Sequence, residues 1–177
     1  LNGSNIDQNS ANDTVSLTVQ VVQALTQRYP LYETFTSSTC GPCTPANTTM
    51  EGIFANNPGE HNSIKYQMSW PGSGDPYFTY EGGDRRTFYG INSVPRVQID
   101  GGWDGNGNAL TQSVYDYYQN QPAFVQMTAT WSRWTKTIET DVTITSLADV
   151  TSNNLKLFAA IYSLREVANV GTNGETE

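Results

Sequence analysis

Alternating apolar and polar residues in the first part of the chain predict strands separated by helices. Residues 15–21 (VSLTVQV) and 31–36 (LYETFT) alternate in this way, as half-buried strands do. Apolar residues at helical spacing follow over 46–54, and the turn-forming sequence NNPG at 56–59 ends that helix. The pattern therefore predicts two strands and then a helix.

The same alternation of elements continues as far as residue 123. Residues 63–70 (SIKYQMSW) read as a strand, and 77–89 as a short helix that contains two glycines. A proline opens the next strand, 93–100, and a helix follows over 110–118. This order predicts an α/β fold with helices on a central sheet.

The pattern changes at Phe124, after which three strands follow with no helix between them. Apolar and polar residues alternate over 125–131 and 138–144, and a dense apolar run covers 155–162. Three strands form a thin sheet with open edges. We therefore expect association with another strand through such an edge.

These patterns divide the chain into three parts. Residues 1–13 are polar and rich in Asn and Ser, which predicts a flexible lead-in. An α/β domain covers 14–123, and a β-rich extension covers 124–177. Because three strands make an incomplete sheet, we expect either that the strand at 15–21 joins them or that the natural chain continues past Glu177.

Charge and composition limit the classes of partner. The 177 residues include 17 acidic and 9 basic ones, a net charge of −8, which argues against nucleic acids and anionic membranes. No apolar run approaches 18 residues, so we expect no integral membrane segment. A surface made largely of amide and hydroxyl side chains favours the cell envelope, in the periplasm or on the outer-membrane surface, or secretion.

Candidate chemistry lies in the sequence Cys40-Gly41-Pro42-Cys43, which holds both cysteines of the chain. We expect a helix to begin at Cys40, where free N–H groups and the helix dipole favour a thiolate. Gly41 and Pro42 restrict the backbone and keep the two sulfurs close. Cys40 would then attack a substrate disulfide, and Cys43 would resolve the mixed disulfide.

Metal binding is less well supported by the sequence than thiol–disulfide exchange. Zinc needs four ligands, and the only histidine, His61, is expected in a solvent-facing loop. A calcium loop starting at Asp104 fails because Tyr115 occupies its twelfth position. No metal and no organic cofactor are therefore expected, but a structural disulfide that never turns over remains an alternative.

Two segments resemble the thioredoxin-like superfamily. Residues 35–43 (FTSSTCGPC) resemble its active-site segment, and residues 90–101 (GINSVPRVQIDG) resemble its cis-proline strand. The resemblance implies a central mixed sheet flanked by helices over 14–123. It also implies a cis bond before Pro95, which would face the cysteines, and a Val94 backbone that bonds a bound peptide.

The whole chain is similar to thioredoxin-like outer-membrane or secreted proteins of Gram-negative bacteria with a β-rich C-terminal extension. Thr39, Gly41 and Pro42 would then complete the substrate-binding surface. Thr39 departs from the family pattern, which has an aromatic residue there. Thr34 replaces the buried acid, and its neighbour Glu33 should point to the opposite face of the sheet.

The resemblance implies an exported thiol–disulfide oxidoreductase that exchanges disulfides with protein or peptide substrates. The alternative is a cell-surface binding or scaffold protein that keeps a thioredoxin-like shape around a structural disulfide. A helix that contains Pro45 near its start, together with Thr34 and Thr39, weakens the case for efficient general disulfide reduction.

Overall fold

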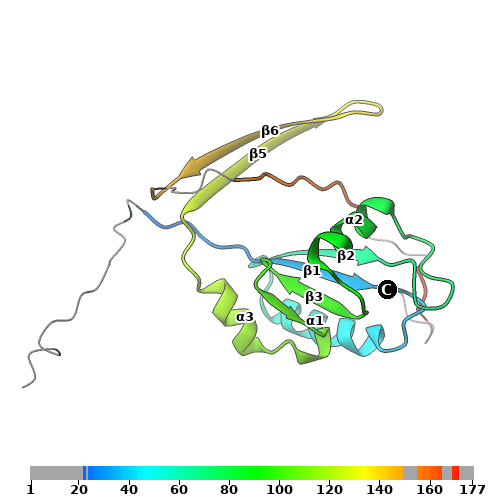
Figure 1. The fold of residues 1–177 in the computed structure, drawn as a ribbon. Coiled ribbons are helices and arrows are strands. Elements are labelled where there is room, and N and C mark those ends of the chain that lie inside the picture. The colour runs from blue at the N-terminus through cyan, green and yellow to red at the C-terminus, as the bar shows by residue number, and fades with distance from the viewer. Residues whose placement is uncertain (1–21, 23, 150–154, 165–168, 172–177) are drawn as a thin grey trace, which may run out of the picture. The chain divides into compact units, whose positions relative to one another are not determined.

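A computed structural model describes residues 22, 24–149, 155–164 and 169–171 (Figure 1). The predicted lead-in at 1–13 and the predicted strand at 15–21 lie outside these residues. The structure divides into two compact units. One contains Thr26–Ala123 together with the described residues from 155 onward, and the other contains a β-hairpin that begins after Phe124.

A four-stranded mixed sheet forms the centre of the larger unit. Its spatial order is β2-β1-β3-β4, with β1 parallel to β2 and antiparallel to β3, which is antiparallel to β4. The strands are β1 (Leu31–Thr36), β2 (Asn62–Gln67), β3 (Arg96–Ile99) and β4 (Trp103–Gly105). In this register Phe35 lies between Tyr66 of β2 and Arg96 of β3.

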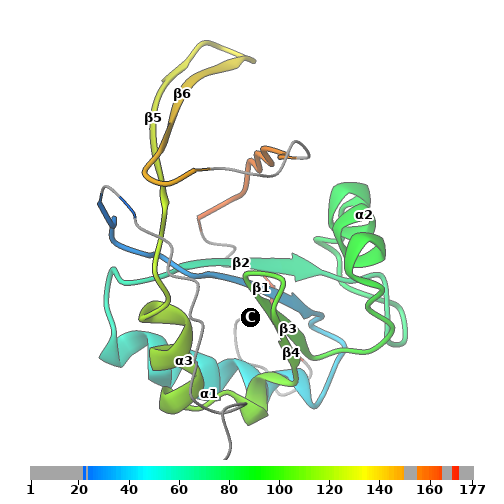
Figure 2. The same cartoon turned by 60° about the vertical axis from the view of Figure 1, so that its left-hand side comes forward.

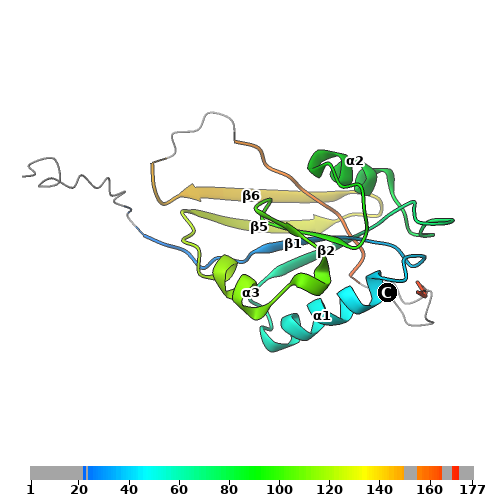
Figure 3. The same ribbon diagram turned by 60° about the horizontal axis from the view of Figure 1, so that its bottom comes forward.

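Helices cover both faces of this sheet. Helices α1 (Cys43–Asn56) and α3 (Gln112–Gln119) lie on one face, and α2 (Tyr80–Tyr89) lies on the other (Figures 2 and 3). Thr79 and Thr111 cap α2 and α3, because each side chain accepts a hydrogen bond from a backbone N–H of the first turn. A short 3-10 helix, η2 (Gly107–Ala109), precedes α3.

Each face of the sheet has its own hydrophobic core. On the side of α1 and α3, the buried side chains are Tyr32, Met50, Val97, Ile99, Leu110 and Tyr115. On the side of α2, they are Phe35, Met68 and Ile91. Tyr32 and Phe35 come from β1 and serve opposite faces, as the alternation of a strand requires.

The hairpin of the other unit consists of β5 (Val125–Arg133) and β6 (Ile138–Ser146), joined in antiparallel register. Side chains on both of its faces are exposed. The third strand expected at 155–162 is wrong, since the structure assigns no strand there. Apolar residues alone do not make a strand, because a strand also needs a backbone partner.

The prediction of a mixed α/β architecture is confirmed, with three α-helices and two sheets in the described part of the chain. None of the helices among the described residues is long and apolar enough to cross a membrane.

Candidate functional site

Cys40 and Cys43 form a disulfide at the junction between β1 and α1. The expected helix start at Cys40 is wrong, because α1 begins at Cys43. Cys40 belongs to the preceding turns, where its N–H donates to Ser37 O and its own carbonyl accepts from Cys43 N. Pro45 occupies the first turn of α1, where a backbone N–H has no intrahelical partner, so the helix tolerates it.

The two cysteines of the motif are buried, whereas the two residues between them are exposed to solvent. Cys40 is 2% exposed and Cys43 is fully buried, whereas Gly41 and Pro42 are exposed. Thiol–disulfide exchange requires in-line access to a sulfur atom. The described conformation therefore presents the backbone of the motif to solvent and keeps its sulfurs covered.

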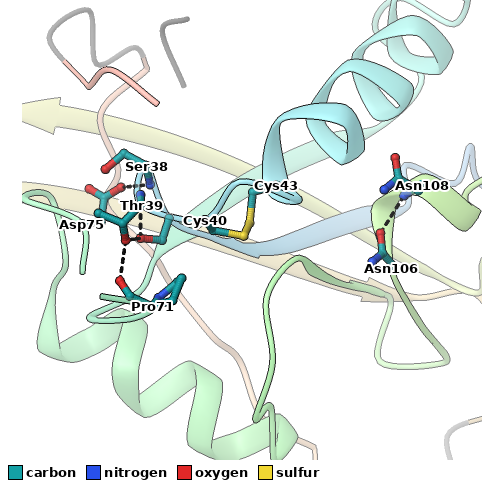
Figure 4. Close-up of a disulfide and its surroundings, with 9 residues drawn as sticks. Ser38, Thr39, Cys40, Cys43, Pro71, Asp75, Asn106 and Asn108 are labelled. Carbon is teal, nitrogen blue, oxygen red and sulfur yellow. Dashed lines mark hydrogen bonds between the residues drawn. A yellow bond between two sulfur atoms is a disulfide. The ribbon is translucent and has the colours of Figure 1, made fainter. Parts of the chain in front are cut away.

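Thr39 ties the loop before Cys40 to the loop after β2. Its hydroxyl donates to Pro71 O at 2.6 Å (Figure 4). The Ser37 hydroxyl lies 2.9 Å from Thr39 Oγ1 and donates to it, since the Thr39 proton is already used. The residue that replaces the expected aromatic side chain thus fixes the backbone beside Cys40.

A second contact between the same two loops comes from Asp75. Its Oδ2 accepts from Ser38 N at 2.7 Å, and its Oδ1 accepts from Tyr77 N at 2.8 Å. Asn169, far away in sequence, also donates to Oδ2 at 3.1 Å. Asp75 is 6% exposed, so these three donors satisfy a nearly buried carboxylate.

The segment before β3 completes the site. The bond between Val94 and Pro95 is cis, so the predicted cis bond is confirmed, and the bond between Trp70 and Pro71 is cis as well. The register that aligns Phe35 with Arg96 places Pro95 beside the end of β1, from which the chain continues to Cys40. Val94 is half-buried and packs against the core on the α2 side.

Arg86 of α2 connects two of these segments. Its Nε donates to Ile91 O at 2.8 Å, and its guanidinium lies 4.8 Å from the centre of the Trp70 ring. The loop that carries Trp70 and Pro71 and the segment that carries Pro95 are therefore both attached to the same helix. Residues 39–43 follow the end of β1, and Val94 and Pro95 precede the antiparallel strand β3. All predicted site residues therefore lie at one end of the sheet.

Thr34 and Glu33 point to opposite faces of the sheet, as predicted. Thr34 is buried on the α1 side, where its Oγ1 lies 3.9 Å from the sulfur of Met50. Glu33 is buried on the α2 side and pairs with Arg85. Glu33 therefore lies on the face of the sheet opposite to α1, which begins at Cys43.

Glu33 accepts four hydrogen bonds. Arg85 donates from Nε at 2.6 Å and from Nη2 at 2.8 Å, and the hydroxyls of Tyr66 and Tyr89 donate at 2.9 and 2.6 Å. Burial raises the pKa of Glu33, but these donors outweigh it and hold that pKa below its ordinary value. Burial and the nearby carboxylate raise the pKa of Tyr66 to about 12.

The expectation of a solvent-facing His61 is wrong. The ring stacks on Phe54 with centroids 4.1 Å apart, and its Nδ1 lies 3.0 Å from the Tyr115 hydroxyl. Burial lowers the pKa of His61. This histidine belongs to an aromatic cluster between α1 and α3, whose members come from distant parts of the sequence.

The residues of the rejected calcium loop have structural partners. Asp104 forms a two-point ion pair with Arg96 across β3 and β4. Asn106 caps η2, because its Oδ1 accepts from Asn108 N (Figure 4). Within the described ranges, no group of three or more His, Cys, Asp or Glu residues could hold a metal ion.

Two contributors to the site, Asp75 and Asn169, and the partner of Glu33, Arg85, carried no signal in the sequence. Asp75 lies in a loop rich in Pro and Gly, Asn169 is isolated among small residues, and Arg85 is one of four charged residues on a short helix. Their roles depend on partners 37, 94 and 52 positions away. Neither spacing nor periodicity could have found them.

Comparison with known proteins adds little to these observations. No family model matches the chain, and no curated protein matches it. A crystal structure of a protein from Agrobacterium tumefaciens is similar over 60% of this chain, with 20% identity and a TM-score of 0.47. The matched region spans 54% of the length of that protein.

Proposed function

We propose that this protein is an exported thiol–disulfide oxidoreductase with a thioredoxin-like domain. The observation that carries the proposal is a C-x-x-C disulfide placed between a strand and the start of a helix. The mixed sheet with helices on both faces supports the thioredoxin-like architecture. The low content of basic residues and the amide-rich surface support a location in the cell envelope or outside the cell.

In the proposed reaction, the Cys40 thiolate of the reduced protein attacks one sulfur of a protein or peptide disulfide. A bond forms between Cys40 and the substrate, and one substrate thiolate leaves. The Cys43 thiolate then attacks the Cys40 sulfur, releases the second substrate thiolate and restores the Cys40–Cys43 disulfide. A small dithiol donor supplies two electrons for the next cycle, and reversal of the same steps oxidises a substrate dithiol.

Burial of both cysteines favours a second function. At 2% and 0% exposure, the disulfide has the environment of a structural cross-link in a binding or scaffold protein. In that case the thioredoxin-like shape would present other surfaces to a partner. In the described part of the chain β5 and β6 pair only with each other, and their outer edges suit association with a strand of another chain.

Trapping a mixed disulfide separates these two functions. With a disulfide peptide as substrate, reduced Cys43→Ser protein should accumulate a covalent adduct at Cys40, and the matched Cys40→Ser protein should not. Mass spectrometry after acid quenching measures both. Wild-type turnover of the peptide and a Cys40 thiol that titrates below the free-cysteine value of about 8.5 would support the oxidoreductase.

The scaffold is supported instead if the disulfide resists dithiothreitol under conditions that leave the fold intact. Equal adduct formation in both variants would also contradict the assigned roles of Cys40 and Cys43.

A further inference from the structure

Asn169 is an asparagine whose side chain is bound at only one end. It is 1% exposed, and its Nδ2 donates to Asp75 Oδ2 at 3.1 Å. Its Oδ1 is also buried and has no hydrogen-bond partner among the residues that the structure describes. A buried acceptor without a donor costs free energy, so this contact is incomplete on the side of Asn169.

Asp75 supplies the other half of the contact. Its remaining partners are the backbone N–H groups of Ser38 and Tyr77, and it forms no ion pair with the described residues. A carboxylate that accepts only neutral N–H donors is chemically matched to a primary amide. An aspartate at position 169 would place a second negative charge next to the Asp75 carboxylate.

This contact lies next to the disulfide. Asp75 Oδ2 accepts from Asn169 and also from Ser38 N, and Ser38 is two residues before Cys40. Figure 4 shows Asp75, Ser38 and Thr39 grouped beside Cys40. A chain segment held on Asp75 is therefore bound to the same carboxylate oxygen as the loop that leads into Cys40.

We propose that Asp75 binds the side-chain amide of an asparagine in an extended peptide, and that residues 169–171 occupy this position in the free protein. The inference rests on the proposed function, because it names the peptide that presents a disulfide to Cys40. The chain's own Asn169 competes for the same carboxylate. Asn169 Oδ1 lacks a donor among the described residues, so a substrate asparagine whose amide nitrogen and oxygen both form hydrogen bonds would displace Asn169.

The first test measures access to the disulfide in the full chain. Oxidised wild-type, Asn169→Asp and Asn169→Ala proteins are mixed with limiting dithiothreitol, quenched with iodoacetamide and analysed by mass spectrometry. Loss of a hydrogen bond to a charged acceptor should raise the reduction rate about ten-fold to a hundred-fold. Asn108→Asp adds the same charge at an exposed asparagine and should leave the rate unchanged.

The second test restores the contact in trans. Capped Asn-Val-Gly peptide added to Asn169→Ala protein should slow the reduction again and move the Ser38 backbone amide resonance back towards its wild-type position. The matched Asp-Val-Gly peptide should do neither. The rescue experiment uses only the Asn169→Ala protein. Its result therefore does not depend on whether the Asn169→Asp protein folds.

The outcomes distinguish this inference from the proposed function. Wild-type reduction rates in both Asn169 variants, or equal effects of the two peptides, overturn the docking site even if wild-type protein turns over a disulfide peptide. Faster reduction and amide-specific rescue, in a protein that never forms a mixed disulfide, leave the docking site standing and overturn the oxidoreductase.

Discussion

Replacing Arg85 by methionine tests how the buried carboxylate of Glu33, on the α2 side of the sheet, is stabilised. The substitution keeps an apolar side chain near Phe88 and Phe158, over which the guanidinium lies, and removes the positive charge. Glu33 is 1% exposed, so its carboxylate cannot gain water in exchange. Two of its four hydrogen bonds are lost at the same time.

The expected cost follows from this burial. Removing one partner of a buried ion pair costs about 3–5 kcal/mol, because the other charge stays buried and unpaired. The Tyr66 and Tyr89 hydroxyls still donate to Glu33, which favours the lower part of that range. Lys65→Met is the matched control, since Lys65 pairs with an exposed Glu51 and should contribute only about 0–1 kcal/mol.

The pH dependence should change sign between the two proteins. In the wild type the pKa of Glu33 is lowered, so its contribution to stability is present at neutral pH and is lost as the pH falls through that pKa. Without Arg85, burial raises the pKa of Glu33 above the unfolded value. The variant therefore gains stability relative to the wild type as the pH falls from 7 towards 5.

Urea unfolding at pH 7 and pH 5 measures both effects. The difference in unfolding free energy between wild-type and Arg85→Met proteins should be smaller at pH 5, and adding Glu33→Gln should recover most of the loss. A difference below about 1 kcal/mol that does not vary with pH would refute the account of a buried charge held by Arg85.

Three further substitutions or titrations examine other parts of the structure. NMR titration of the single imidazole should give a pKa below 6.5 for His61, because its partial burial opposes the charge, and stability should fall as the pH drops through 6.5. A value at or above 6.5 contradicts this half-buried position. Gly74→Ala should destabilise the protein by about 1–3 kcal/mol in thermal unfolding, because φ is +77° and a Cβ would lie 2.5 Å from the Ser69 backbone. Gly52→Ala, in α1 with nothing near its Cβ, should instead stabilise by about 0.5–1 kcal/mol; similar effects at both glycines would argue against the tight loop. Tyr66→Phe should remove a phenol that ionises near pH 12 from the ultraviolet titration, and an unchanged high-pH step would contradict its bond to Glu33.

Local signals in the sequence were enough for the elements around the disulfide. The alternation at 31–36, the apolar stripe of α1 and the Asn/Pro/Gly turn after it matched the structure to within a few residues. Strand β4 was missed, because three residues are too few to show a period. The apolar run at 155–162 was predicted as a strand from its composition, but no described segment of the chain pairs with it.

The cysteine motif could be found from the sequence, but its surroundings could not. Strand alternation placed Glu33 on the correct face without identifying Arg85. His61 was misjudged because its neighbours, Phe54 and Tyr115, are brought to it by two different helices. Contacts of this kind arise only when the elements pack, so no local pattern reveals them.

The hydrogen bonds around the disulfide point to where its reactivity is controlled. Thr39 binds Pro71 and Ser38 binds Asp75, so the loop before Cys40 is attached at consecutive residues to the loop after β2. Neither bond involves a sulfur atom, and both lie within two residues of the less buried cysteine. Both bonds hold the loop before Cys40 and leave α1 and the strands of the sheet without a direct part in either contact. We therefore expect that a partner able to release them would loosen this loop, whereas the distance between the cysteines is set by the turn before α1.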